Sequence, residues 1–298
     1  MFGKKNLKAF FGLILALLIV VWSSLQVKSH DLKREPNAGN ASQVVSISDV
    51  EWGALNPARG DQSPKAATLW GDRTASGPSG FLVQFVEDFS SPPHIHNVSY
   101  RGVVISGLIH NDDPNAENLW LPQSSFWTQP AGDVHITAAD STNNLAYIEI
   151  EDGPYLVMPA EEAFDNGERP VNIDESNLIW LDASNILWID QSGGTNATLE
   201  TQLAFLWGSP QGNQLNGTLV KLPIGFKGEL HSQGPIFRAI VIQGQPNYQG
   251  SDGSGIKVLE PGSYFGSEGE TIHQLACAAE EECIIYVRQK GKYSVIAK

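Results

Sequence analysis

Hydrophobic residues in this chain fall into short runs that are rich in β-branched and aromatic side chains. Polar residues are interspersed within the runs, and Gly, Pro, Asn and Asp separate them, as is typical of strands joined by turns. Beyond the N-terminal segment, no stretch has a convincing amphipathic helical pattern. We therefore predict an all-β protein. The clearest predicted strands are FLVQFV (81–86), RGVVISG (101–107), LAYIEIE (145–151), GTLVKL (217–222), FRAIVIQG (237–244) and CIIYVRQ (283–289).

The chain repeats itself once, with a nearly constant spacing between six pairs of short sequences in the same order. The repeat predicts two all-β domains, 44–159 and 178–298, each a small barrel or double-sheet roll. The polar, turn-rich stretch 160–177 indicates a linker. The pairs are LWGD (69–72) and LWGS (206–209), His94 and His231, RGVVISG (101–107) and RAIVIQG (238–244), SFW (125–127) and SYF (263–265), His135 and His273, and DGPYLV (152–157) and KGKYSV (290–295).

Residues 1–29 are expected to lie outside the fold. Three lysines precede the apolar run 9–22, which suits the hydrophobic region of a signal peptide and is short for a membrane span of about 20 residues. Val27, Lys28 and Ser29 offer a loose cleavage pattern. A cleaved signal peptide would give a periplasmic or secreted protein. The alternative is an uncleaved anchor facing the periplasm, which is the only membrane contact that we expect.

The charge of the chain argues against nucleic acid as a partner. The formal net charge is −14, and removing residues 1–29 with their four lysines makes it −18. A body this acidic repels phosphate backbones. Hydrophobic residues make up 41% of the chain, which is enough for a buried core.

Cys277 and Cys283 flank the acidic turn AAEEE. In an oxidising compartment they could form a disulfide across the mouth of a hairpin, and free thiols are the alternative. Their spacing alone is poor support for a metal site.

The stretch SPPHIHNVSYRGVVISG (91–107) carries two histidines one residue apart at a predicted strand. Because side chains alternate between the faces of a strand, His94, His96 and Tyr100 should share one face. His135 follows a turn in the next predicted hairpin. Three imidazoles that meet inside a barrel would bind a metal ion and leave coordination positions open, and neutral imidazole suits iron, zinc, nickel or copper.

The spacing of these residues resembles the two sequence motifs of the cupin superfamily, His-x-His-x₃-Glu-x₆-Gly and Pro-x-Gly-x-x-His. Together with the internal repeat, it makes most of the chain similar to a bicupin family of unknown function. The resemblance implies two tandem cupin barrels, which are double-stranded β-helices or jelly rolls. The matching positions are His94, His96, Tyr100 and Gly107 in the first motif, and Pro130, Gly132 and His135 in the second.

Tyr100 stands where many cupins have a ligating Glu. A tyrosine with an ordinary pKa near 10 is a poor metal ligand at neutral pH. The resemblance therefore implies a centre of His94, His96 and His135, like that of acetylacetone-dioxygenase-like cupins. Fe(II) or zinc is expected there, and manganese, nickel and copper stay open. The uncompensated positive charge should favour an anionic, oxygen-chelating guest, to which Tyr100 could donate a hydrogen bond.

Two further residues are candidates for this site. The repeat aligns Glu149 with Val287, so Glu149 faces the first interior if Val287 faces the second. We then expect Glu149 to bond to a ligating histidine or a bound water, with direct ligation and a solvent-exposed position as alternatives. His110 precedes Asn-Asp-Asp-Pro, and we expect it to cap that turn at the rim, with substrate contact as the alternative.

The second copy has lost part of the pattern. His231 and His273 persist, but Gln233 replaces the second histidine and Phe237 takes the Tyr100 position. We expect a vestigial site of His231, Gln233 and His273, and a structural or dimerising role for this domain. A homodimer stays open.

We expect an exported metal-dependent enzyme, such as an Fe(II) dioxygenase, that acts on a small oxygenated organic molecule. One alternative is a metal- or ligand-binding protein without catalysis, for sensing or storage. The other is a structural bicupin with a relic site. An enzyme needs open metal positions that face a mostly apolar pocket, whereas a relic would bind no metal.

Overall fold

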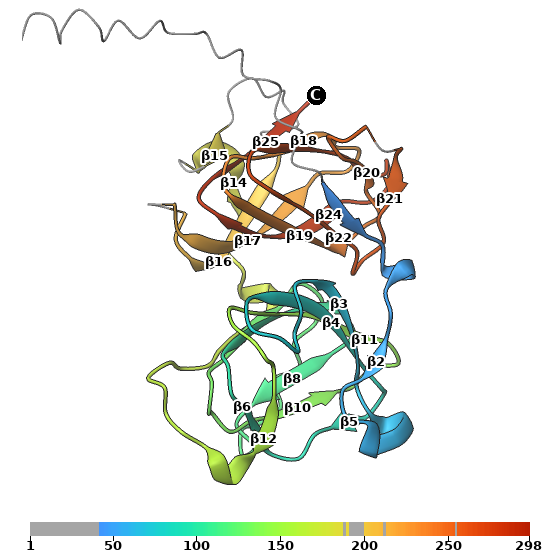
Figure 1. The fold of residues 1–298 in the computed structure, drawn as a ribbon. Helices are drawn as coiled ribbons and strands as arrows, with labels where there is room; N and C mark the ends of the chain where they lie inside the picture. The colour runs from blue at the N-terminus through green and yellow to red at the C-terminus, as the bar shows by residue number, and fades with distance from the viewer. Residues whose placement is uncertain (1–41, 187–188, 191–199, 211–212, 254) are drawn as a thin grey trace, which may run out of the picture. The chain divides into compact units, whose positions relative to one another are not determined.

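The computed structural model describes residues 42–298 except 187–188, 191–199, 211–212 and 254 (Figure 1). The predicted signal peptide or anchor in residues 1–29 lies outside the described residues. Within the described part of the chain, every helix is too short or too polar to cross a membrane.

The described residues form an all-β jelly-roll fold, as predicted from the sequence. The strands divide into an N-terminal half, β2 to β13, and a C-terminal half, β14 to β25. The helical elements of the described residues are five short 3₁₀ turns: η1 (Ile47–Asp49), η2 (Pro57–Gln62), η3 (Ala160–Glu162), η4 (Glu175–Asn177) and η5 (Ala183–Asn185).

The N-terminal half contains one seven-stranded sheet and two smaller ones. In the small sheets, β10 (Ile136–Ala139) lies between β5 (Phe89–Ser90) and β8 (Ile109–Asp112), and β12 (Val157–Pro159) pairs with β6 (His94–His96). A bridge between His94 and His135 links the small sheets. The order of the large sheet is β13 (Val171–Ile173), β9 (Phe126–Gln129), β7 (Tyr100–Ser106), β11 (Asn144–Ile150), β4 (Ser79–Phe85), β3 (Lys65–Trp70) and β2 (Gly53–Ala54).

The C-terminal half repeats this arrangement with a seven-stranded and a six-stranded sheet. The large sheet has the order β1 (Gln43–Val45), β22 (Tyr264–Glu268), β19 (Ile236–Gln243), β24 (Cys283–Lys290), β17 (Leu215–Leu222), β16 (Gln202–Gly208) and β14 (Leu181–Asp182). The smaller has the order β15 (Ile189–Asp190), β25 (Tyr293–Ala297), β18 (Lys227–Ser232), β23 (Thr271–Ala276), β20 (Asn247–Gln249) and β21 (Lys257–Val258).

One edge strand of each large sheet comes from the segment that precedes the other half in the sequence. Strand β1 precedes the N-terminal half, yet it pairs with β22 of the C-terminal half. Strand β13 leads into the C-terminal half, yet it pairs with β9 of the N-terminal half. The exchange pairs the free sides of β22 and β9, so that the short strands β1 and β13 form one edge of each large sheet.

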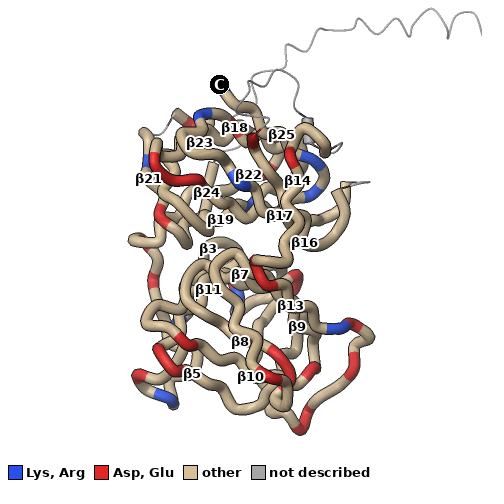
Figure 2. The backbone as a smooth tube through the Cα atoms, turned by 180° about the vertical axis from the view of Figure 1, so that it is seen from behind, with Lys and Arg blue, Asp and Glu red and all other residues tan. Residues whose placement is uncertain are grey.

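The strands of the large sheets are apolar on both faces because both faces are buried. On β7, Val104 faces the interior of the N-terminal half, whereas Val103 belongs to a cluster that also contains Ile240 and Tyr286 of the C-terminal half. The two large sheets therefore pack against each other through a shared apolar layer. Most Asp, Glu, Lys and Arg residues lie in loops and at strand ends (Figure 2).

Candidate metal centre

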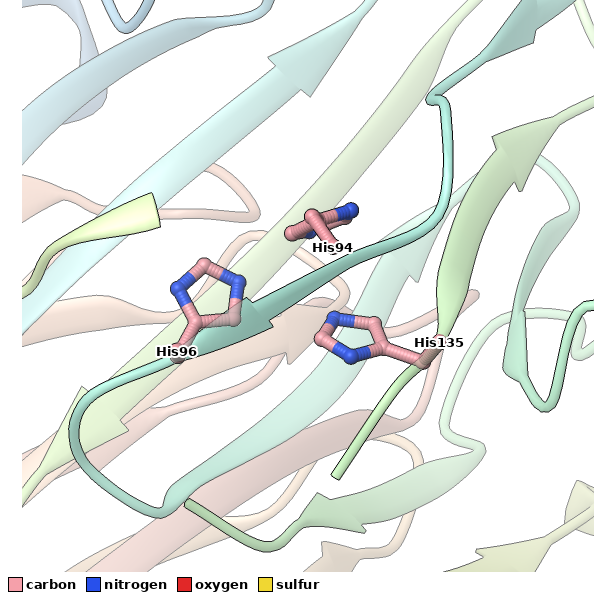
Figure 3. A group of neighbouring side chains, drawn as sticks. All are labelled: His94, His96 and His135. Carbon is pink, nitrogen blue, oxygen red and sulfur yellow. The ribbon is translucent and has the colours of Figure 1, made fainter. Parts of the chain in front are cut away.

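His94, His96 and His135 come together inside the N-terminal half (Figure 3). One nitrogen from each lies within 4.8 Å of the others. His94 and His96 share one face of β6, and His135 lies directly before β10. The backbones of His94 and His135 exchange two hydrogen bonds of 3.0 Å, which fix the two strands beside each other. The local pairing of β6 with the segment before β10 therefore positions all three rings.

Backbone carbonyls orient the three rings in the same way. Each Nδ1 lies within hydrogen-bond distance of a backbone carbonyl, so each Nδ1 carries the proton and each Nε2 keeps its lone pair. Metal-binding histidines usually make such hydrogen bonds, which fix the tautomer and the orientation of the ring. The donor set therefore fits a divalent transition metal. The distances are 2.9 Å from His94 to Pro92 O, 3.0 Å from His96 to Leu156 O and 3.1 Å from His135 to Asp133 O.

The electrostatics of the cluster keep the imidazoles neutral. Burial lowers the pKa of His94, and burial and the neighbouring imidazoles lower the pKa of His96 well below its usual value. The same causes lower the pKa of His135 to about 3. The lone pairs on Nε2 are thus available at neutral pH.

Tyr100 lies beside this cluster as a neutral phenol. Its hydroxyl donates to Oδ1 of Asn111 at 2.9 Å and lies 3.4 Å from Nε2 of His135. Burial raises the pKa of Tyr100 well above its usual value. Turned from Asn111, this uncharged hydroxyl could donate a hydrogen bond to a bound oxygen atom.

Tyr155 is a member of the site that sequence reasoning missed. Its ring stacks on His96, with ring centroids 4.3 Å apart, and its hydroxyl lies 3.1 Å from Nε2 of His96. Because Nδ1 of His96 carries the proton, the Tyr155 hydroxyl donates to Nε2. The internal repeat includes the sequence DGPYLV around Tyr155. Only the pairing of β12 with β6, however, places Tyr155 against a histidine.

His94 and His96 of the three-histidine cluster line a cavity of about 440 Å³. Its walls are mainly apolar, and Tyr100, Tyr155, Asn111 and Thr137 add hydroxyl and amide groups. This combination of apolar walls with a few convergent polar groups is typical of a site for a small molecule. The described residues that line the cavity include no Asp or Glu.

Glu149 lies away from this cavity, so our expectation that it contacts a ligating histidine was wrong. Its carboxylate is 1% exposed and accepts hydrogen bonds from Tyr147 at 3.1 Å and from Tyr286 of the C-terminal half at 3.0 Å. Arg101 and Arg288 lie 3.7 Å from it. The alternative of a solvent-exposed position is also wrong.

The error came from the alignment of the two copies. Trp70 donates to the hydroxyl of Tyr147 at 3.0 Å, and Trp207 donates to that of Tyr286 at 2.9 Å. Tyr147 therefore corresponds to Tyr286, and Glu149 to Arg288 rather than to Val287. A shift of one residue moves every side chain of a strand to its opposite face.

His110 is also outside the cavity. It is fully buried on β8, and its Nδ1 accepts a hydrogen bond of 3.2 Å from the backbone N–H of Leu119. Its neighbours Ile109 and Asn111 face the interior, so strand alternation points His110 the other way, against Trp120. It holds the loop that follows β8 at Leu119. The expectation that it caps the Asn-Asp-Asp-Pro turn at the rim was therefore wrong, as was the alternative of a substrate contact.

The predicted second-copy residues do not form a cluster. His273 pairs across the strands with Leu230, which takes the place that His94 holds opposite His135. His231 points outward to Glu270 at 3.2 Å, with 25% of its side chain exposed, and Gln233 donates to Ser294 at 2.6 Å. Here too the alignment of His94 with His231 was wrong by one residue. The vestigial site is therefore not assembled.

His273 should make the fold sensitive to acid. It is fully buried, with its nitrogens 2.9 Å from the Tyr248 hydroxyl and 3.1 Å from the Ser267 hydroxyl, and burial and His231 lower its pKa to about 3. Below about pH 6.5 the unfolded chain binds a proton at His273 that the folded chain does not. The free energy of unfolding should thus fall on acidification, by up to about 1.4 kcal/mol per pH unit from this residue.

Urea unfolding of the wild type and His273→Gln between about pH 7 and about pH 4 measures this effect. The variant keeps the three histidines of the cluster, so their titration cancels in the comparison. We expect a flatter dependence of stability on pH in the variant. Parallel curves for the two proteins would contradict a neutral His273 in the folded state.

Cys277 and Cys283 are joined by a disulfide, with Cα atoms 6.0 Å apart. The bond closes the loop between β23 and β24, far along the chain from the histidine cluster.

The sequence comparison decides the family. A family model described as a domain of unknown function, DUF4437, matches residues 43–296, which is nearly all of the described chain. The chain belongs to the DUF4437 family. No curated protein sequence is significantly similar to this DUF4437 protein.

Solved structures share the fold of the DUF4437 protein at low sequence identity. A proposed dioxygenase from Nostoc punctiforme has a TM-score of 0.60 and 14% identity, over 85% of this chain and 84% of that one. Salicylate 1,2-dioxygenase from Pseudaminobacter salicylatoxidans has a TM-score of 0.55 and 12% identity, over 97% of this chain and 94% of that one. Vicilin from Corylus avellana has a TM-score of 0.54 and 10% identity, over 85% of this chain and 87% of that one. These likenesses show a cupin-like jelly-roll fold, which enzymes and seed proteins share.

Proposed function

We propose that this DUF4437 protein is a metal-dependent dioxygenase, or a related enzyme, that acts on a small oxygenated organic molecule. The observation that carries the proposal is the convergence of His94, His96 and His135, each held through Nδ1 by a backbone carbonyl, beside a mostly apolar cavity that His94 and His96 line. The dioxygenase names of two structural neighbours support this chemistry. Fe(II) or zinc fits three neutral imidazoles, as do manganese, nickel and copper.

Three roles follow for the residues of the site. His94, His96 and His135 would hold the ion through Nε2, as in acetylacetone-dioxygenase-like cupins. A divalent ion there would polarise the oxygens of a substrate and, as iron, supply the redox chemistry that O₂ requires. Tyr155 and Tyr100 lie beside the imidazoles and would orient the substrate by turning their hydroxyls from Nε2 of His96 and Oδ1 of Asn111 to its oxygens. The apolar walls exclude water from the reacting groups.

Oxygen uptake tests the proposed reaction. The full chain, loaded with Fe(II) under nitrogen, would be mixed with air-saturated buffer and with a panel of diketones and hydroxy acids. We expect uptake that depends on the organic compound, that is lost in His96→Ala, and that persists in His231→Ala. Metal binding without uptake for any compound would favour a sensor or storage protein, and absence of bound metal would favour a relic site.

We also propose that the two halves are tandem cupin barrels, 44–159 and 178–298, with 160–177 as the linker. The exceptions are β1, which completes the large sheet of the C-terminal half, and β13 in the linker, which completes that of the N-terminal half. The matching order of strands in the two halves supports this division. The second barrel would have a structural or dimerising role. We propose that the protein is exported, since a disulfide suits an oxidising compartment.

A further inference from the structure

Arg73 is the only Lys or Arg among the described residues that line the cavity. None of the ion pairs found in the described part of the chain includes it. Its Nε is buried and has no hydrogen-bond partner there. The adjacent Asp72 instead accepts hydrogen bonds from Thr74 at 2.8 Å and 2.7 Å. A desolvated guanidinium N–H without an acceptor is costly, and a bound anion would satisfy it.

A row of aromatic rings connects Arg73 with the histidine cluster. The guanidinium carbon lies 6.0 Å from the ring centroid of Phe81, and Phe81 packs edge-on against Tyr155 at 5.3 Å. Tyr155 stacks on His96 and donates its backbone N–H to the carbonyl of Arg73 at 2.8 Å. Arg73, His94 and His96 thus line the same cavity, with His135 beside the other two histidines, so that one small molecule can contact both the guanidinium and the histidine cluster.

The charges of the cavity select an anion. Three neutral imidazoles leave the charge of a divalent ion uncompensated, and Arg73 adds a further positive charge. The described lining residues contribute no carboxylate to balance them. In a chain with a formal net charge of −14, this concentration of positive charge is local to the site. The planar guanidinium offers a fork of donors that matches a carboxylate.

We infer that Arg73 determines substrate specificity by binding a carboxylate, so that the substrate is a small organic acid with a separate pair of oxygens for the three-histidine centre. This inference rests on the proposed function, because it needs the metal at His94, His96 and His135. It adds a second point of attachment, which would fix the orientation of the substrate in the cavity.

Calorimetric titration of the zinc-loaded full chain tests the inference. The probes are protocatechuate, a catechol with a remote carboxylate, and its neutral amide. We expect the acid to bind at least about 10-fold more tightly than the amide, as for a hydrogen bond to a charged group. Arg73→Gln should abolish this preference, and Arg73→Lys should keep part of it. The control is Arg169→Gln, which removes the same charge from a surface arginine paired with Asp165.

The metal content of every sample separates the two hypotheses. If zinc is bound and Arg73→Gln keeps the preference for the acid, or the wild type shows none, the inference on Arg73 is wrong and the proposed function stands. If zinc is not bound, the proposed function is wrong, while a preference that depends on Arg73 would still support an anion site. Thermal unfolding of each variant confirms that it is folded.

Discussion

Replacing His96 with alanine is expected to remove the metal ion from the protein. His96 supplies one of three Nε2 ligands, and the loss of its ring also takes away the surface on which Tyr155 stacks. Removing even a group that only supports a ligand typically lowers metal affinity about 10- to 100-fold, so loss of a ligand should cost at least about 100-fold. Elemental analysis of protein purified without a histidine tag measures the metal directly.

His231→Ala is the matched control for that experiment. It also removes one histidine, but from the outer face of β18, where His231 contacts Glu270 rather than another imidazole. We expect the same metal content as in the wild type. Equal loss of metal in both variants would show that the ion does not sit where the three rings of the N-terminal half meet.

Replacing Glu149 with alanine is expected to destabilise the fold by about 3–5 kcal/mol, as when one partner of a buried ion pair is removed. Glu149 and Glu151 together face Arg101 and Arg288 between the two large sheets, and Arg288 has only 3% of its side chain exposed. Without Glu149, Arg288 stays buried with less compensating charge, and the Tyr147 and Tyr286 hydroxyls lose their acceptor. Urea unfolding measures the loss.

Glu151→Ala provides the comparison for this prediction. Glu151 contacts the same arginines at 2.7 Å and 2.6 Å, but 42% of its side chain is exposed, so water screens its loss and the effect should be smaller. Metal content should be unchanged in both variants. Loss of metal in Glu149→Ala with normal stability would contradict the assignment of Glu149 to the contact between the halves.

The all-β fold and the convergence of the three histidines could be predicted because both depend on local patterns. His94 and His96 share a face because side chains alternate along a strand. The spacing of the two motifs places His135 beside that strand. Glu149 and His231 depended instead on an alignment between the two copies. An error of one residue there is invisible in the sequence but reverses the face of the strand.

Tyr155 and Arg73 could not be predicted because their positions depend on pairings between distant segments. Tyr155 reaches His96 only because β12 pairs with β6, and Arg73 approaches the cavity through its backbone contact with Tyr155. His110 is a further case. The sequence placed it before a turn, whereas it lies on strand β8, and no pattern in the sequence tells that the loop around Trp120 covers its face of that strand.

The most direct test of a metal site formed jointly by the three histidines is an anomalous difference map from crystals of the zinc-loaded full chain. The account predicts one strong peak within coordination distance of Nε2 of His94, His96 and His135, at about 2.0–2.1 Å from each nitrogen. A peak bound by other residues, or the three rings without a peak in a chain that holds zinc, would contradict it.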